Sequence, residues 1–322
     1  MTGFFTSIES TLPILFIIAL GFYLRRAGWF ADSFGGNISK LILNIALPAG
    51  IFVSILKYLT RDTLFSLSDG LAYFALATVL GYLVAFLMVK LLNVRRGRCG
   101  VFINVIVNAN TIFIGLPLNV ALFGELSMPY FLVCYVVNTL STWTLGAWLI
   151  ANDDPTVSAD SQKRGFDWKK LLTPPIIGAL LAFVFLLANV QVPSFLNSTL
   201  GYVGELVTPL ALIYVGIVLS DAGLKSIHFD KDASAALIGR FVVMPAITVT
   251  LLLFSGGTLG TLPSIEAHTL IVQSAVPALA VLPILAHAAN GDVEYATNVV
   301  TASTLLFVII IPIVNSLLPL IA

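Results

Sequence analysis

The sequence predicts an all-α membrane protein whose ten transmembrane helices form two inverted five-helix repeats. Three observations support this fold class. The 322-residue chain is 58% hydrophobic and 10% charged, with a mean hydropathy of +1.01, whereas soluble domains are about half apolar and about a quarter charged. The apolar residues gather in long continuous runs. The two halves of the chain also carry prolines in the same order.

Ten apolar runs are close to the roughly 20 residues that a helix needs to cross a bilayer. The runs are continuous and do not alternate, which excludes a strand barrel. Because Arg25 and Arg26 follow the first run instead of preceding it, we expect a retained helix and not a cleaved signal peptide. The expected spans are 8–25, 36–56, 70–92, 99–123, 127–151, 171–190, 199–220, 234–255, 265–289 and 295–320.

Basic residues indicate that both termini face outward from the inner (plasma) membrane. Lys and Arg concentrate in cytoplasmic loops, and with the N-terminus outside only Lys57 and Arg61 fall at outer ends. The basic residues at inner ends or inner loops are Arg25, Arg26, Lys40, Lys90, Arg95, Arg96, Arg98, Lys163, Arg164, Lys169, Lys170, Lys225 and Lys231. The polar segment 152–170 is interpreted as a short cytoplasmic linker between a first repeat, 1–151, and a second, 171–322.

Proline positions indicate the internal repeat. Three prolines of the first half have partners in similar sequence contexts of the second half: Pro13 with Pro174, Pro48 with Pro209, and Pro117 with Pro283. The separation along the chain is identical for the first two pairs and only slightly longer for the third. Since five spans is an odd number, the second copy must enter the membrane from the opposite side. Inverted repeats of this kind are an architecture of secondary transporters.

The fourth and ninth spans are predicted to break near the middle of the membrane. The fourth holds "VNANTIFIGLPLN" and the ninth holds "QSAVPALAVLP", so Gly115, Pro117 and Pro283 are expected to shape a crossover. Unwound backbone inside a membrane must line a cavity or be satisfied by neighbouring groups. The N-termini of half-helices carry partial positive charge and suit an anionic group. A small hydrogen-bonding pocket for an anion is therefore expected where the two breaks cross.

Asn110 and Thr111, at the start of the first break, are the leading substrate-binding candidates, because an amide can donate a hydrogen bond to a carboxylate. Asn108 is a further candidate, although it shares a helix face with Asn104 and buried Asn often joins spans by hydrogen bonds. The other expected contributors are Gln273, Ser274, Val276, Pro277, Ile114 and Asn44.

Three charged residues are candidates for coupling transport to a proton or a sodium ion, because charge within a membrane is costly. Glu205 lies inside the seventh span. The alternatives to a coupling role are a polar partner on a neighbouring span and a wet position near the outer interface. Arg240 lies inside the eighth span, and we favour snorkelling to the inner interface over anion attraction or pairing with Glu205. Asp69, at the outer start of the third span, is expected to be interfacial.

No enzymatic site is predicted. The sequence contains no His/Cys/Asp cluster with metal-ligand spacing and no phosphate-binding glycine loop before a helix. The formal net charge is zero, which gives no reason to expect a nucleic-acid partner. Apart from a coupling ion, no cofactor is expected.

Several segments resemble the auxin efflux carrier family, which includes plant PIN carriers and bacterial permeases for small carboxylates. "NTIFIGLPL", followed by "FGE", is similar to the fourth-span motif of that family. The last two spans resemble its proline crossover and a following Ser-Thr-Leu signature, here Ser303, Thr304 and Leu305. The segment "FSLSDGLAYF" is similar to the start of the third span, with Asp69 at the acidic position. Tyr73 stands where PIN carriers have lysine.

This resemblance covers essentially the whole chain and implies a prokaryotic, short-loop member. It implies an architecture like that of bile-acid sodium symporters and NhaA-type exchangers. Spans one, two, six and seven would form a scaffold domain that pairs into a homodimer. Spans three to five and eight to ten would form a transport domain. Asn110 is carried over as a contact to the substrate carboxylate, with Pro117 and Pro277 shaping the crossover.

The sequence thus predicts a secondary active or potential-driven carrier for a small organic anion, working by elevator-type alternating access. One alternative is a sodium- or proton-coupled exchanger or symporter of the same fold, which would be expected to place a carboxylate at the crossover. A second is a ligand sensor that does not transport. An integral membrane enzyme is the weakest alternative.

Overall fold

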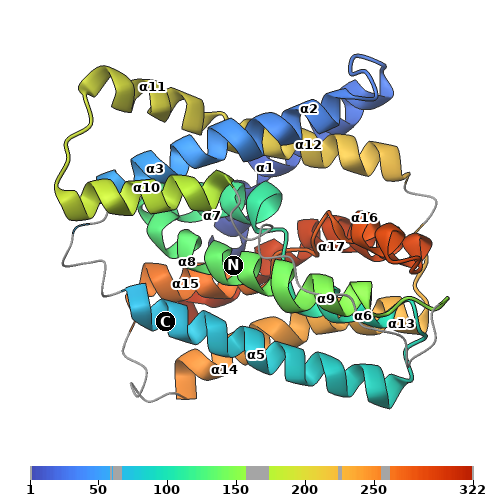
Figure 1. Cartoon of the computed structure of the whole chain (residues 1–322). Helices are drawn as coiled ribbons and strands as arrows, with labels where there is room; N and C mark the ends of the chain where they lie inside the picture. The colour runs from blue at the N-terminus through green and yellow to red at the C-terminus, as the bar shows by residue number, and fades with distance from the viewer. Residues whose placement is uncertain are drawn as a thin grey trace.

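Helices joined by short loops make up the described parts of the computed structural model, which are residues 2–58, 60, 67–156, 174–223, 227–254 and 262–320 (Figure 1). These residues contain no β-strand, only an isolated bridge between Ala109 and Ala278. Most of the predicted linker 152–170 lies outside the described residues. So do the predicted topology markers Arg61, Lys163, Arg164, Lys169, Lys170 and Lys225.

The helices of the first half match the ranges expected from the apolar runs to within a few residues. They are α1 (Thr2–Arg26), α2 (Phe34–Leu41), α3 (Leu47–Tyr58), α5 (Leu67–Leu92), α6 (Cys99–Val107), α7 (Leu116–Phe123), α8 (Met128–Ser141) and α9 (Ala147–Ala151). Wide π-turns η1 (Ile42–Ala46), η2 (Thr111–Gly115) and η4 (Thr142–Gly146) precede α3, α7 and α9, and a 3-10 turn, η3 (Glu125–Ser127), precedes α8.

The second half follows the same pattern. It contains α10 (Pro174–Ala188), α11 (Ser194–Glu205), α12 (Val207–Ala222), α13 (Lys231–Ile238), the π-turn η7 (Gly239–Val243), α14 (Met244–Phe254), α15 (Ser264–Ser274), α16 (Leu282–Ala288), α17 (Val293–Leu317) and the 3-10 turn η8 (Leu318–Leu320). An interruption at Leu206 separates α11 from α12, a feature that the sequence did not predict.

Six helical stretches of the described residues are long and apolar enough to cross a membrane: Phe34–Lys57, Asp69–Leu92, Glu125–Ala151, Ser194–Asp221, Lys231–Phe254 and Val293–Leu317. Two shorter apolar helices span Thr111–Phe123 and Pro174–Ala188. The chain is therefore helical and multi-spanning in character, while its arrangement as ten spans in two inverted repeats stays a prediction.

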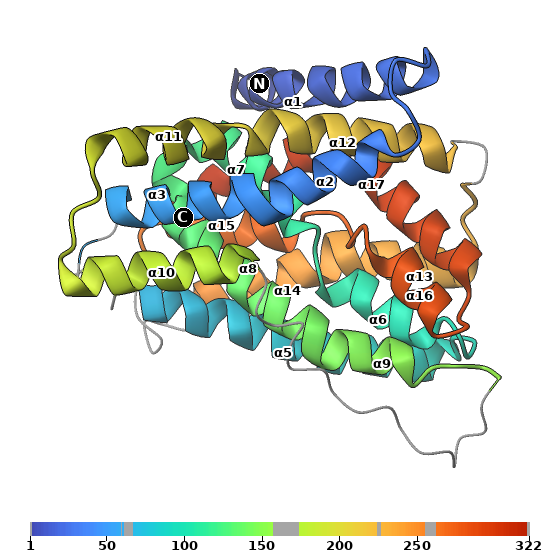
Figure 2. The same ribbon diagram turned by 45° about the horizontal axis from the view of Figure 1, so that its top comes forward.

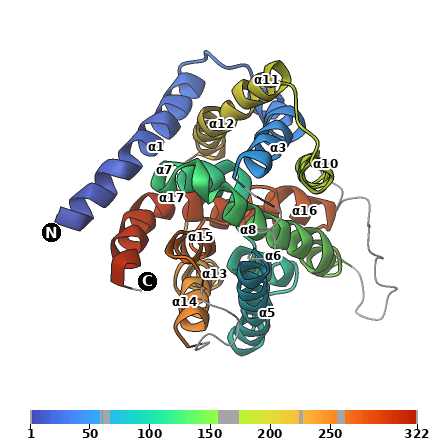
Figure 3. The same ribbon diagram turned by 90° about the vertical axis from the view of Figure 1, so that its left-hand side faces the viewer.

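The helices pack in two groups. The first helix group is α1, α2, α3, α10, α11 and α12, in which α12 lies along α1 and α3 lies against α10 and α11 (Figure 2). Glycines allow these close approaches, as small residues do between membrane helices. A Cβ atom on Gly204 of α11 would lie 2.6 Å from the Cα of Gly50 of α3. The second helix group is α5 to α9 and α13 to α17, and Figure 3 shows both groups from one end.

Ion pairs tie the second helix group together where α5 ends and α6, α13 and α17 begin. Arg98 donates to Asp230 and to Asp292, each at 2.7 Å. Partial burial acts to raise the pKa of both carboxyls, but hydrogen bonds from the amides of Ala233 and Tyr295 and from Arg98 outweigh it, and each pKa is lowered. This cluster fixes the starts of three helices at one end of the molecule, which we call the Arg98 end.

Candidate functional site

Two unwound segments cross at the centre of the second helix group. Helix α6 ends at Val107 and α15 ends at Ser274, and the chain resumes helical turns at Thr111 and Leu282. Between these points Ala109 and Ala278 form an antiparallel bridge. The Asn110 backbone amide donates to the Pro277 carbonyl at 2.8 Å. The two breaks predicted from the sequence therefore lie side by side, and we call this region the crossover.

Side chains of α8 and α17 hydrogen-bond to the unwound backbone of the crossover. The Asn138 carboxamide accepts from the Ala109 amide at 2.8 Å and donates to the Ala109 carbonyl at 3.0 Å. On the other unwound segment, the Ser303 hydroxyl accepts from the Ala278 amide at 3.2 Å. These contacts meet the requirement that buried backbone groups find partners. Asn138 was not among the predicted site residues, because a single amide in an apolar span carries no positional signal.

Arg240 of η7 holds the ends of both broken helices. Its guanidinium is 1% exposed and donates to the carbonyls of Ile106 and Val107, at 2.9 and 3.1 Å. It also donates to the carbonyls of Gln273, at 3.4 Å, and Ser274. The prediction that Arg240 snorkels to the interface was wrong, because the side chain points inward to the C-termini of α6 and α15. Pairing with Glu205 was also wrong.

The placement of Arg240 sets the electrostatics of the crossover. Helix C-termini carry partial negative charge and helix N-termini partial positive charge. One cation offsets the two C-terminal ends, while the N-termini of η2 and α16 stay at the crossover without such an offset among the described residues. The net effect favours an anionic group.

A cavity of about 360 Å³, the crossover cavity, opens beside these N-termini, between the two helix groups. No charged side chain lines it among the described residues. The lining residues are Ser39, Leu43, Asn44, Asn110, Thr111, Ile112, Phe113, Tyr135, Asn138, Thr139, Thr142, Trp143, Pro174, Pro175, Tyr214, Leu279, Ala280, Val281 and Ile284. Polar side chains thus line its η2 and α8 walls, with apolar and aromatic groups around them.

Three predicted residues lie in this cavity: Asn110, Thr111 and Asn44. The Asn110 side-chain oxygen accepts from the Phe113 amide at 3.3 Å and caps η2. Its side-chain amide nitrogen makes no hydrogen bond to any residue that the structure describes, and is therefore available to a ligand. Asn44 lies across the cavity and donates to the Lys40 carbonyl at 2.8 Å.

The other predicted residues lie behind the cavity wall. Asn108 is fully buried and donates to Tyr82 and Asn104. Gln273 donates to the Gly115 carbonyl at 2.9 Å. Ser274 donates to the Ile271 carbonyl. Ile114 and Val276 belong to the buried core. Pro117 and Pro283 lie in the first turns of α7 and α16.

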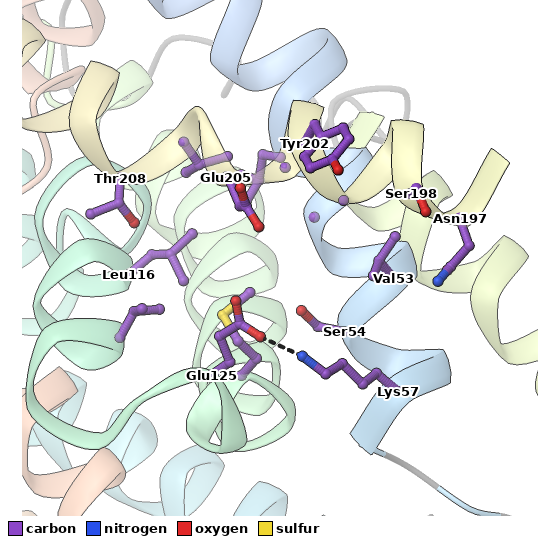
Figure 4. Close-up of a pocket in the computed structure, with 17 residues that line it drawn as sticks. Val53, Ser54, Lys57, Leu116, Glu125, Asn197, Ser198, Tyr202, Glu205 and Thr208 are labelled. Atoms are coloured by element: carbon purple, nitrogen blue, oxygen red, sulfur yellow. Dashed lines mark hydrogen bonds and ion pairs between the residues drawn. The ribbon is translucent and has the colours of Figure 1, made fainter. Parts of the chain in front are cut away.

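A second cavity, of about 490 Å³, lies between α3, α11 and α12 on one side and α7, η3 and α8 on the other (Figure 4). We call it the Lys57 cavity. Lys57 of α3 pairs with Glu125 of η3 across it at 2.8 Å. Glu205, the last residue of α11, is exposed and lines the same cavity. The three predicted charged candidates, Glu205, Arg240 and Asp69, are not brought together.

Glu266 is a buried acid that the sequence reasoning missed. It lies in the first turn of α15 and is 1% exposed. Neither carboxylate oxygen has a hydrogen-bond partner among the described residues, and Asp69 of α5 is the neighbouring charge. Gly70 makes room for the side chain, since a Cβ there would overlap the Glu266 carboxylate. An acid inside the expected span 265–289 was the available signal.

Comparison with known proteins gives a consistent result. Residues 6–315 match the family model described as "Membrane transport protein". An uncharacterized transporter of Methanocaldococcus jannaschii is 22% identical over 312 residues, covering 94% of this chain and 96% of that protein. The uncharacterized transporter YfdV of Escherichia coli K12 is 23% identical over 318 residues, covering 95% of each chain. An uncharacterized transporter of Methanothermobacter thermautotrophicus is 22% identical over 315 residues, covering 96% and 97%.

Proposed function

The chain belongs to the membrane transport protein family, the auxin efflux carrier family that its motifs resemble, and from this premise we propose that it is a secondary carrier for a small organic anion. The crossover cavity is its substrate site. The observation that carries the proposal is the charge arrangement there. Two helix N-termini and the free side-chain amide of Asn110 face an uncharged cavity, while Arg240 offsets both opposing C-termini.

In this proposal the ten predicted spans form two inverted repeats in the inner membrane, with both termini outside. The first helix group is the scaffold and the site of homodimer contact, and the second carries the crossover. Asn138 and Ser303 support the repeat, because each bonds one strand of the crossover and their separation in sequence nearly equals that of Pro117 and Pro283. Movement of the second group against the first would expose the site alternately, as in an elevator.

The substrate carboxylate would lie against η2, with Asn110 and Thr111 donating hydrogen bonds to it. Amide and hydroxyl donors bind a carboxylate without burying a compensating cation. The aromatic and aliphatic lining from Phe113, Tyr214 and Ile284 would surround the apolar remainder of the molecule. The cavity volume of about 360 Å³ falls within the range of small-molecule sites, roughly 300 to 1,000 Å³.

The same lining favours an anion carrier over a cation exchanger at this site. An exchanger would be expected to bind its cation with a carboxylate, and the described lining of the crossover cavity has none. Coupling to a proton or sodium ion through a residue elsewhere remains compatible with the proposal. So does movement driven by membrane potential, worth about 2.3 kcal/mol per charge per 100 mV.

Thermal unfolding of the purified protein with acetate, benzoate, succinate and citrate tests the proposal. A ligand that binds only the folded state raises the unfolding temperature with concentration. We expect at least one carboxylate to do so for the wild type and the effect to be lost in Asn110→Ala.

The matched control is Asn37→Ala, an exposed asparagine of α2 outside both cavities. It should keep the wild-type response. The proposal fails if no carboxylate stabilises the wild type, or if Asn110→Ala responds as strongly as Asn37→Ala.

A further inference from the structure

The two cavities are lined by residues that the internal repeat pairs with one another. In the first helix group, the sequence offset that relates Pro48 to Pro209 also relates four pairs of lining residues. Leu47 and Thr208 form one pair and both line the Lys57 cavity, while the members of the other three pairs line different cavities. Leu43, Asn44 and Tyr214 line the crossover cavity. Their partners at this offset, Gly204, Glu205 and Val53, line the Lys57 cavity. Each of these three pairs therefore has one member in each cavity.

In the second helix group the exchange holds between helices and not between paired residues, since Phe113 and its partner Leu279 both line the crossover cavity. Pro117 and Pro283 are repeat partners, in the first turns of α7 and α16. Helix α7 contributes Leu116 and Val120 to the Lys57 cavity, and α16 contributes Ile284 to the crossover cavity. In an inverted repeat, a residue and its partner occupy equivalent places on opposite sides of the membrane. The two cavities are thus equivalent places on the two sides.

We infer that the Lys57 cavity is the second half of the translocation path, into which the substrate passes when the second helix group moves, and that Glu205 weakens anion binding there. This inference rests on the proposed function for the identity of the substrate as an anion. It adds a second binding site and a residue that makes the two sides unequal.

The asymmetry follows from the pair Asn44 and Glu205. Both lie one turn before a proline, on the first-group wall of their cavity. On the crossover side the wall presents a neutral amide. On the Lys57 side it presents a carboxylate, which repels an anion.

The other charges of the Lys57 cavity do not offset Glu205. Lys57 and Glu125 form an ion pair with each other across the cavity, as the dashed line in Figure 4 marks. Glu205 has no ion-pair partner among the described residues. The described lining residues of the cavity therefore carry a net negative charge, and an anion that reaches them is held more weakly than in the crossover cavity. The path favours release on the Lys57 side.

Cysteine labelling tests the placement of the cavities without knowledge of the substrate. Ser54→Cys in the Lys57 cavity and Thr139→Cys in the crossover cavity are each made in a Cys99→Ser, Cys134→Ser background and treated with a membrane-impermeant maleimide. Ser54→Cys should react in intact cells, and Thr139→Cys only in inverted vesicles. Reaction of both from the same side overturns the inference.

Side-specific transport tests the role of Glu205. Radiolabelled benzoate or succinate, whichever the wild-type protein transports, is supplied to proteoliposomes from either side. Glu205→Gln should lower KM on the Lys57 side by about tenfold, and Asn44→Asp should raise KM on the crossover side by about tenfold, the size of one like-charge repulsion in a wet cavity. Glu294→Gln, an exposed acid of α17 outside both cavities, should change neither value.

The outcomes separate this inference from the proposed function. If Asn110→Ala abolishes carboxylate transport while Glu205→Gln leaves both KM values unchanged, the crossover site stands and the role of Glu205 falls. If the wild type transports neither carboxylate but the cysteines label from opposite sides, the anion assignment falls and the two-sided path stands.

Discussion

At the scale of single residues, the most consequential side chain is Arg240. It is buried in the second helix group and its donors are divided between two helix ends that come from different halves of the chain. Such a position uses the planar fork of arginine, whose five N–H donors point in fixed directions. Lysine, which carries a point charge on a flexible side chain, cannot make the same set of hydrogen bonds.

Arg240→Lys is therefore expected to destabilise the protein. Lysine keeps the charge but cannot reach carbonyls on both α6 and α15, and each lost hydrogen bond to a charged donor costs about 2 kcal/mol. Thermal unfolding in detergent measures the effect. The control is Arg26→Lys, an exposed arginine whose guanidinium lies 5.6 Å from the centre of the Phe22 ring. Equal unfolding temperatures for the two variants would contradict this role of Arg240.

Glu266→Gln is expected to stabilise the protein at about pH 8. The ionised carboxylate is buried without a hydrogen-bond donor among the described residues, beside another acid, which costs free energy. Glutamine keeps the shape and removes the charge. The gain, about 1 kcal/mol, should shrink near about pH 5, where protonation already neutralises more of the wild-type carboxyl.

Unfolding temperatures at the two pH values measure this effect. Glu294→Gln, on the exposed surface, provides the comparison. A decrease in stability on Glu266→Gln at the higher pH would show that the carboxylate has a favourable partner in the folded protein.

Arg240 and Glu266 also show why the sequence could not place every site residue. Distance along a span fixes how deep a residue lies, but not which neighbouring helix its side chain faces. Arg240 lies near enough to a helix end to snorkel, and only its hydrogen bonds to carbonyls of α6 and α15 show that it points inward. The position of Asn110 could be predicted from the sequence, because the glycine and proline that follow it mark the break in the helix.

At the scale of elements, the crossover depends on side chains that replace the missing helical hydrogen bonds. Asn138 is the clearest case, since its carboxamide bonds both the amide and the carbonyl of Ala109. It acts toward Ala109 as a neighbouring strand would. The conformation of the break is thus set by α8 as well as by Pro117.

Asn138→Ala should abolish carboxylate-induced stabilisation as well as lower the unfolding temperature. The buried amide of Ala109 would lose its partner, at about 1 to 3 kcal/mol for an unsatisfied group, whereas its carbonyl would still accept from the Thr111 amide at 2.9 Å. The same ligand titration used for Asn110→Ala measures both effects. Asn37→Ala is again the matched control, and a normal ligand response in Asn138→Ala would show that α8 does not position the site.

The elements themselves were largely predictable. Continuous apolar runs located the helices. The combination of Asn, Gly and Pro located the break in 99–123, and two prolines located the break in 265–289. The interruption at Leu206 was not predicted, because "YVGELVTP" carries no more helix-breaking residues than uninterrupted stretches do. The crossing of two breaks from opposite halves of the chain is a tertiary fact that the repeat suggested and the contacts show.

At the scale of the whole molecule, the two ends of the bundle are stabilised differently. The Arg98 end has a cluster in which Asp230 and Asp292 each cap a helix and bond Arg98. At the opposite end, among the described residues, the ion pair of Lys57 and Glu125 joins the two helix groups. The Arg98 cluster holds the second helix group together. The pair of Lys57 and Glu125 is half exposed, and such a pair can break at little cost in free energy.

Stability of the Arg98 end should depend on acid. The pKa of Asp292 is lowered in the folded protein, so its contribution is complete above the unfolded value of about 3.9 and is lost as pH falls through the folded value. Asp292→Asn keeps the helix cap but removes the charge. It should lower the unfolding temperature at about pH 7, with a smaller difference from wild type at about pH 3. Asp32→Asn, an exposed partner of Arg25, should show little change at either pH.

The hydrogen bond from Asn110 to Pro277 has a consequence for how the protein is made. Pro277 and Arg240 are synthesised after the first half has left the ribosome and entered the bilayer. Until then the Asn110 amide and the carbonyls at the end of α6 lack these hydrogen-bond partners. The first half therefore cannot complete its own fold. Fragments 1–156 and 157–322, produced separately, should each be degraded in the cell, and produced together they should protect one another.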